Sequence, residues 1–172
     1  MSRPALLLAL ASALGISTAA ATESVVIDKA ATRLQVQVTD HAAGQPKPKL
    51  TLNTTMATWC VACKAEMPQL MYLRSTFKPE ELGMVGLPYD EKDAAASLKA
   101  WAAANHAPYE LLADLSKDDI LSIKAMVLTT FRMDAVPAAF VTDADGHILR
   151  AKLGPPSVSE IRELLRAQRD RK

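Results

Sequence analysis

The sequence is poor in residues that build metal sites and lacks the long apolar runs that cross membranes. Its 172 residues include two cysteines and three histidines, and His41, His106 and His147 are scattered without the spacing of metal ligands. We therefore expect no metal or other cofactor. There is no glycine-rich phosphate loop, internal repeat or low-complexity segment. No apolar run is long enough to span a bilayer as a mature helix.

The charge balance argues against two further classes of partner. Twenty basic and 19 acidic residues give a formal net charge of +1. This near-neutral charge gives no electrostatic argument for binding to nucleic acid or to an anionic membrane surface. Hydrophobic residues make up 49% of the chain and charged residues 23%, as in an ordinary globular protein with one domain. We expect a monomer that does not bind nucleic acid.

The first residues follow a different pattern from the rest. Arg3 gives a positive start, residues 5–16 form an apolar run, and residues 19–21 are three alanines suited to signal peptidase. This order predicts a secretory signal peptide at residues 1–21 and a single domain at 22–172. An N-terminal helix of the fold, or an uncleaved anchor, is the alternative. The prediction places the protein in the periplasm or otherwise outside the cytoplasm.

Both cysteines lie in one short segment, Cys60-Val61-Ala62-Cys63, between a strand predicted at 50–56 and a helix predicted at 60–77. Cysteines at this spacing can close a small disulfide ring, and the positive end of the helix dipole lowers the pKa of the first thiol. So short a ring constrains little chain entropy and would be a poor structural staple. Structural zinc usually needs four ligands. The pair is therefore predicted to be a dithiol–disulfide exchange centre.

The rest of the chain predicts alternating strands and helices. Pro68 lacks a backbone donor and is expected to kink the helix at 60–77, although a helix that starts near Pro68 is the alternative. His147 follows a tight-turn sequence, and we expect its side chain to have no partner.

We predict strands at 24–27, 33–38, 84–87, 109–113, 136–142 and 147–152, and helices at 91–105, 116–130 and after the capping box of Ser157 and Glu160.

This order of elements resembles the thioredoxin-like fold, an α/β fold with a central mixed sheet flanked by helices. Residues 57–63 resemble the active-site signature of that family, and Val136-Pro137 resembles its loop whose proline is cis and faces the cysteines. The similarity is closer to the exported TlpA/ResA/CcmG-like thiol-disulfide oxidoreductases. Residues 91–113 add a helix and a strand that this group has as an insertion.

A second feature of that group is its Cys-x-x-Glu-x-Pro continuation, which Cys63, Glu66 and Pro68 match. The resemblance implies an enzyme with a thioredoxin-like activity. Its substrate would be a disulfide-containing exported protein, for example in cytochrome c maturation or cofactor-site assembly, and its reductant a membrane protein of the DsbD/CcdA kind. The implied site consists of the redox disulfide Cys60 and Cys63, of Glu66 as an influence on their protonation, and of the substrate contacts Trp59, Val136 and Pro137.

The chain also departs from the family pattern. Val61-Ala62 stands where members usually have a proline or glycine, and Thr54 stands where cytosolic thioredoxins have a buried aspartate. Three other functions share the fold. A thiol peroxidase needs a proline and a hydroxyl residue ahead of its cysteine, at another spacing than Thr58. A copper-binding chaperone of the Sco type needs one more residue between the cysteines and a downstream histidine. A non-catalytic adaptor needs neither cysteine.

Overall fold

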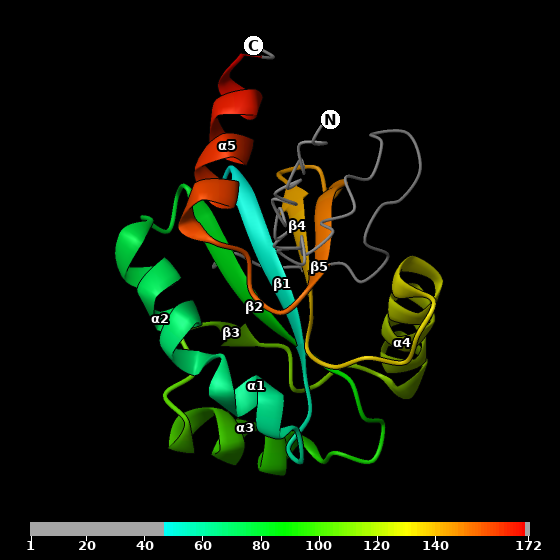
Figure 1. Ribbon diagram of the computed structural model, residues 1–172. Helices are drawn as coiled ribbons and strands as arrows, with labels where there is room; N and C mark the ends of the chain where they lie inside the picture. The colour runs from blue at the N-terminus through cyan, green and yellow to red at the C-terminus, as the bar shows by residue number, and fades with distance from the viewer. Residues whose placement is uncertain (1–46, 171–172) are drawn as a thin grey trace, which may run out of the picture.

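The computed structural model describes residues 47–170 (Figure 1). The predicted signal peptide, the strands predicted at 24–27 and 33–38, and His41 lie outside the described residues. The elements are, in chain order, β1 (Leu50–Met56), α1 (Val61–Ala65), α2 (Met67–Thr76), β2 (Leu82–Pro88), α3 (Ala95–Ala104), β3 (Glu110–Leu111), α4 (Lys117–Phe131), β4 (Ala138–Asp143), β5 (Ile148–Leu153) and α5 (Val158–Arg169).

The five strands form one mixed sheet in the order β3-β2-β1-β4-β5, with β1 in the centre as predicted. β1 pairs in parallel with β2 and antiparallel with β4. The sheet separates two layers of helices (Figure 1). Leu70 of α2 and Ile161 of α5 pack on one face, and Ile123 of α4 packs on the other. Because β1 has strands on both sides and helices on both faces, all seven of its residues are buried.

The helix predicted at 60–77 is two helices. α1 ends at Ala65 and α2 begins at Met67, with Glu66 between them. Pro68 explains the break, because it has no N–H to donate to the carbonyl of Lys64 and its ring crowds that turn. The prediction of one kinked helix was therefore wrong in its continuity, and the interruption lies two residues before the proline.

The helix predicted at 91–105 begins four residues later, since α3 spans Ala95–Ala104. Its sequence is rich in alanine, but Asp90 and Asp93 accept hydrogen bonds from the segment before Cys60 and hold the preceding residues in a loop. The strand predicted at 109–113 is the two-residue β3. The capping box of α5 is confirmed, because Ser157 Oγ accepts from the Glu160 N–H at 3.2 Å and the Glu160 carboxylate accepts from the Ser157 N–H at 2.6 Å.

One close approach in the sheet gives a test of this packing. A Cβ at Gly86 in β2 would lie 2.4 Å from the ring carbon Cε2 of buried Tyr109. We predict that Gly86→Ala lowers the free energy of unfolding by about 1–3 kcal/mol, because the ring must move within a packed core. Urea denaturation followed by circular dichroism measures the change. Wild-type stability in this variant would contradict the packing described.

Candidate active site

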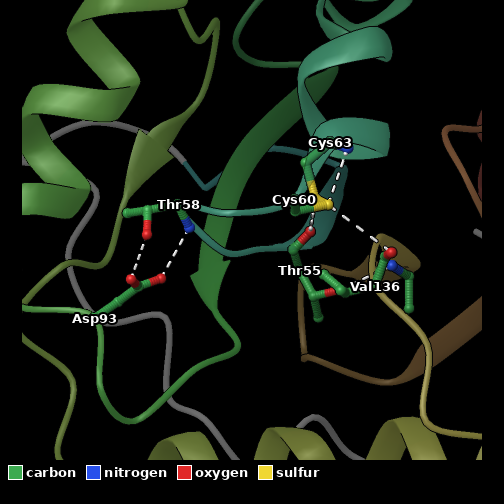
Figure 2. The surroundings of a disulfide bond; sticks show 7 residues. Thr55, Thr58, Cys60, Cys63, Asp93 and Val136 are labelled. Atoms are coloured by element: carbon green, nitrogen blue, oxygen red, sulfur yellow. Dashed lines mark hydrogen bonds between the residues drawn. A yellow bond between two sulfur atoms is a disulfide. The ribbon is translucent and has the colours of Figure 1, made fainter.

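Cys60 and Cys63 are joined by a disulfide bond at the end of β1 (Figure 2). Cys60 caps the start of α1, because its sulfur accepts a hydrogen bond from the Cys63 N–H at 3.0 Å. Cys60 is 4% exposed and Cys63 is 1% exposed, so Cys60 is the more accessible of the two cysteines. Val61 and Ala62 between them are both exposed to solvent. An incoming group therefore reaches the pair at Cys60.

Two carbonyl groups flank the disulfide. The sulfur of Cys60 lies 3.9 Å from the Val136 carbonyl oxygen, and the sulfur of Cys63 lies 3.9 Å from the Thr55 carbonyl oxygen. The bond between Val136 and Pro137 is cis, and Pro137 is buried. The Thr55 hydroxyl accepts from the Ala138 N–H at 2.8 Å and so fixes this loop to β1. The structure thus brings the cysteine pair and the Val136–Pro137 loop together, as the resemblance implied.

Trp59 precedes the pair and is 59% exposed. Its indole N–H donates to Asp90 Oδ2 at 2.8 Å, which fixes the direction of the ring. The pKa of Asp90 is lowered, first by the hydrogen bond from the Lys92 N–H and second by that from Trp59. Trp59 is therefore an exposed aromatic surface held beside Cys60, rather than part of the core.

Thr58 is held by a residue that the sequence analysis did not identify. The Asp93 carboxylate accepts from the Thr58 N–H at 2.8 Å and also from the Thr58 hydroxyl (Figure 2). Asp93 lies 35 positions further along the chain. An acid just before an alanine-rich helix gives no sequence signal for such a contact, because it resembles an ordinary first-turn acid.

Glu66 lies between α1 and α2 and is partly buried. Burial raises the pKa of its carboxyl to about 7. A Cβ at Gly154 would lie 3.3 Å from Glu66 Oε1, so the glycine leaves room for the carboxyl group. The Tyr109 hydroxyl is buried without a hydrogen-bond partner within the described part of the chain. The pKa of Tyr109 is raised by burial and further by the charge of Glu66.

His147 has a partner, contrary to the prediction. Its Nδ1 lies 3.3 Å from the Asp143 carboxylate, and with Asp145 these residues place three possible metal-ligating atoms within 4.8 Å of one another. However, Asp143 Oδ1 already accepts from the backbone N–H groups of Asp145 and His147, at 3.0 and 2.9 Å. Those bonds close the turn between β4 and β5, so the cluster is explained by the hairpin.

Comparison with known families places the chain in one of them. The family model for AhpC/TSA matches residues 18–151, well over half of the chain. The chain belongs to the AhpC/TSA family. The match spans the cysteine pair, Glu66 and the Val136–Pro137 loop, so every residue of the predicted site lies within the part shared with the AhpC/TSA family.

Curated relatives of this AhpC/TSA chain carry thiol-disulfide names. A thiol:disulfide interchange protein DsbE homolog of Paracoccus denitrificans is 29% identical over 121 residues, 70% of this chain and 59% of the relative. Thiol-disulfide oxidoreductase ResA of Bacillus cereus is 23% identical over 109 residues, 63% of this chain and 57% of the relative. The chain thus spans less than three fifths of the length of these relatives.

Solved structures confirm the thioredoxin-like fold of this AhpC/TSA chain. StoA from Bacillus subtilis has a TM-score of 0.51 at 15% identity, covering 84% of this chain and 98% of that one. A thiol-disulfide isomerase from Corynebacterium glutamicum has a TM-score of 0.54 at 16% identity, covering 71% and 81%. At such identities the likeness establishes the fold.

The raised pKa of Glu66 predicts a pH-dependent stability. Its pKa is about 7 in the folded state against 4.5 ordinarily, so the folded protein binds the extra proton between these values and stability falls as pH rises through about 7. The full shift corresponds to about 3 kcal/mol, and solvent screening of the partly exposed carboxylate reduces this to about 1–2 kcal/mol.

We therefore expect Glu66→Gln to gain stability relative to the wild type at pH 8 and to gain none at pH 4. Urea unfolding of the oxidised protein at both values measures the difference. Exposed Glu80 provides the control, because Glu80→Gln should follow the wild type at every pH. A Glu66→Gln curve parallel to the wild type would contradict the shift.

Proposed function

We propose that this protein is a thiol-disulfide oxidoreductase that reduces disulfide bonds of exported proteins. The observation that supports it most is the Cys60–Cys63 disulfide, in which the sulfur of the more accessible cysteine, Cys60, lies beside the Val136 carbonyl. The names of the curated relatives support the reaction class. The activity follows from a cysteine pair that switches between a disulfide and a dithiol while the fold around it is kept.

The proposed reaction begins with the reduced pair. The Cys60 thiolate attacks one sulfur of a substrate disulfide, forms a mixed disulfide and releases the other substrate sulfur as a thiolate. Cys63 then loses its proton and attacks Cys60, which releases the second substrate thiolate and leaves the Cys60–Cys63 disulfide. Two electrons pass to the substrate. The Cys63 N–H that points at the Cys60 sulfur at 3.0 Å stabilises the attacking thiolate.

Substrate contacts are proposed for Trp59, Val136 and Pro137. The exposed indole of Trp59 offers apolar area beside the reacting sulfur. Val136 is half-buried, and no acceptor for its N–H is found among residues 47–170. An extended substrate segment that lies along Val136 would supply that acceptor. The ring of Pro137, next to Val136, would limit how closely that substrate segment can approach.

Glu66 is proposed to move the proton of the pair. A carboxyl group with a pKa of about 7 can both accept and donate a proton near neutral pH, which is the requirement for a general acid–base group. Thr54, buried in β1 where an aspartate might stand, has no titratable group. Proton transfer would therefore run along the side of the pair that faces the α1–α2 junction.

The location and partners are proposed from the sequence. Residues 1–21 would direct export, and a membrane thiol reductant of the DsbD/CcdA kind would return the pair to the dithiol form. A monomer suffices for this cycle. Within residues 47–170, the structure contains no helix that is both long and apolar enough to cross a membrane.

A peroxidase and a copper chaperone are weaker candidates. The hydroxyl of Thr58 donates to Asp93, so its proton is not available as a donor to a peroxide. His147 contacts Asp143 at the β4–β5 turn, which gives it a structural role there. Stoichiometric binding of Cu(I) without turnover of a disulfide substrate would favour a copper-binding chaperone over a thiol-disulfide oxidoreductase.

The mechanism predicts different outcomes for the two cysteines. Cys60→Ser should lower the rate of insulin disulfide reduction at least about a hundredfold, because no thiolate attacks. Cys63→Ser should accumulate a mixed disulfide, seen as the summed mass of protein and substrate. Ala125→Ser, on the exposed side of α4, is the control and should keep wild-type turnover. Full activity of Cys60→Ser would rule out the mechanism.

Glu66 should also appear in the pH dependence of turnover. We expect the wild-type rate to show an inflection near pH 7, where the carboxyl group titrates. Glu66→Gln should lose this inflection and turn over at least about 100-fold more slowly, while Glu80→Gln keeps the inflection and the rate. Rates measured from pH 5 to 9 decide this. The same inflection in Glu66→Gln would assign it to another group.

A further inference from the structure

The turn that leads into Cys60 is held at both of its central residues. The Cys60 N–H donates to the Ala57 carbonyl at 3.1 Å, which closes a β-turn with Thr58 and Trp59 at its centre. Asp93 accepts from Thr58, and Asp90 accepts from Trp59. The turn is therefore fixed by carboxylates that come from a different part of the chain.

These carboxylates belong to one loop, residues 89–93, which we call the clamp loop. It follows β2 and precedes α3. The hydroxyl of Tyr89 donates to the carboxylate of Asp134, three residues before Pro137. Glu91 forms an ion pair with Lys124 of α4 at 3.2 Å. The clamp loop thus connects the segment before Cys60, the segment before Pro137 and α4.

Asp93 makes the most specific contact of this loop. Figure 2 shows its carboxylate facing Thr58, with one oxygen toward the backbone N–H and the other toward the hydroxyl. Thr58 thus gives both of its donors to Asp93. Bonds of this kind to a carboxylate are stronger than those between neutral groups. The peptide plane at Thr58, and with it the course of the chain into Cys60, is fixed.

We propose that Asp93 is a positioning residue of the cysteine pair and favours its disulfide form over its dithiol form. Two effects act in the same direction. The fixed turn holds Cys60 in the arrangement found in the disulfide. The negative charge of the Asp93 carboxylate, bound to Thr58 two residues before Cys60, opposes a second negative charge on the thiolate. The proposal rests on the proposed function only in that the pair must interconvert between the two forms.

The test is the equilibrium with glutathione at one fixed pH. Two glutathione molecules reduce the Cys60–Cys63 disulfide to two thiols and become one glutathione disulfide, with two electrons transferred. For the full chain with Asp93→Asn, we expect the equilibrium constant of this reaction to shift about fivefold toward the dithiol. This equals about 20 mV in reduction potential, since a tenfold change corresponds to about 30 mV. Asp114→Asn is the matched control, because this exposed carboxylate pairs with Lys99.

A second variant separates a specific contact from a general loss of structure. Thr58→Val keeps the shape of the side chain and removes the hydroxyl donor, so it should shift the constant in the same direction by a smaller factor. The double variant should match Asp93→Asn alone, because the two changes remove one interaction. If Asp93→Asn fails to fold, a shift of twofold or more in Thr58→Val supports the proposal and a constant equal to the wild type overturns it.

The remaining outcomes are equally decisive. A constant for Asp93→Asn within 1.5-fold of both the wild type and Asp114→Asn would overturn the proposal, even if the variant were less stable. Additive shifts in the double variant would overturn it too. The constant is measured without a protein substrate. A wild-type protein that equilibrates with glutathione but does not reduce insulin would therefore count against the proposed function and leave this proposal standing.

Discussion

The backbone pairing of β1 determines where the residues of the candidate site meet. Because β1 runs parallel to β2 and antiparallel to β4, the ends of β1 and β2 and the start of β4 lie at the same edge of the sheet. The segment before Cys60, the clamp loop and the Val136–Pro137 loop continue from those three ends. Loops that start from hydrogen-bonded strands inherit fixed positions. The disulfide, its flanking carbonyls and the two aspartates therefore need no additional element to bring them together.

The sequence was sufficient for those parts that local patterns encode. The spacing of Cys60 and Cys63 and the apolar residues of β1 are local signals, and the capping box of α5 is another. The contact between Thr58 and Asp93 joins two loops, and the two residues are 35 positions apart. No sequence pattern in either loop predicts it. The start of α3 was misplaced for a similar reason, because the Asp90 carboxylate accepts from the Lys92 N–H at 3.0 Å and so competes with a helix in the residues before Ala95.

The break at Glu66 shows a similar limit. Pro68 made a disturbed helix predictable, but the position of the interruption depended on which residue could end one helix and begin the next. That residue is Glu66, and its place between two helices beside Gly154 is the reason its carboxyl group is buried. In the sequence, Glu66 was linked to the cysteine pair only by its position three residues after Cys63. Its raised pKa could not be read from the sequence, because the desolvation comes from segments that are distant along the chain.

The exposure of Val61 and Ala62 has a consequence for how such a protein can diverge. Both residues form part of the disulfide ring through their backbone, yet their side chains are exposed to solvent and take no part in the core. Substitutions there change the environment of the sulfurs without removing buried contacts elsewhere. Cys60 and Cys63 themselves are buried in a core cluster with Leu98, whereas the two side chains between them lie outside that packing. A lineage can therefore alter the surroundings of the sulfurs through two surface positions while the buried contacts of the scaffold are preserved.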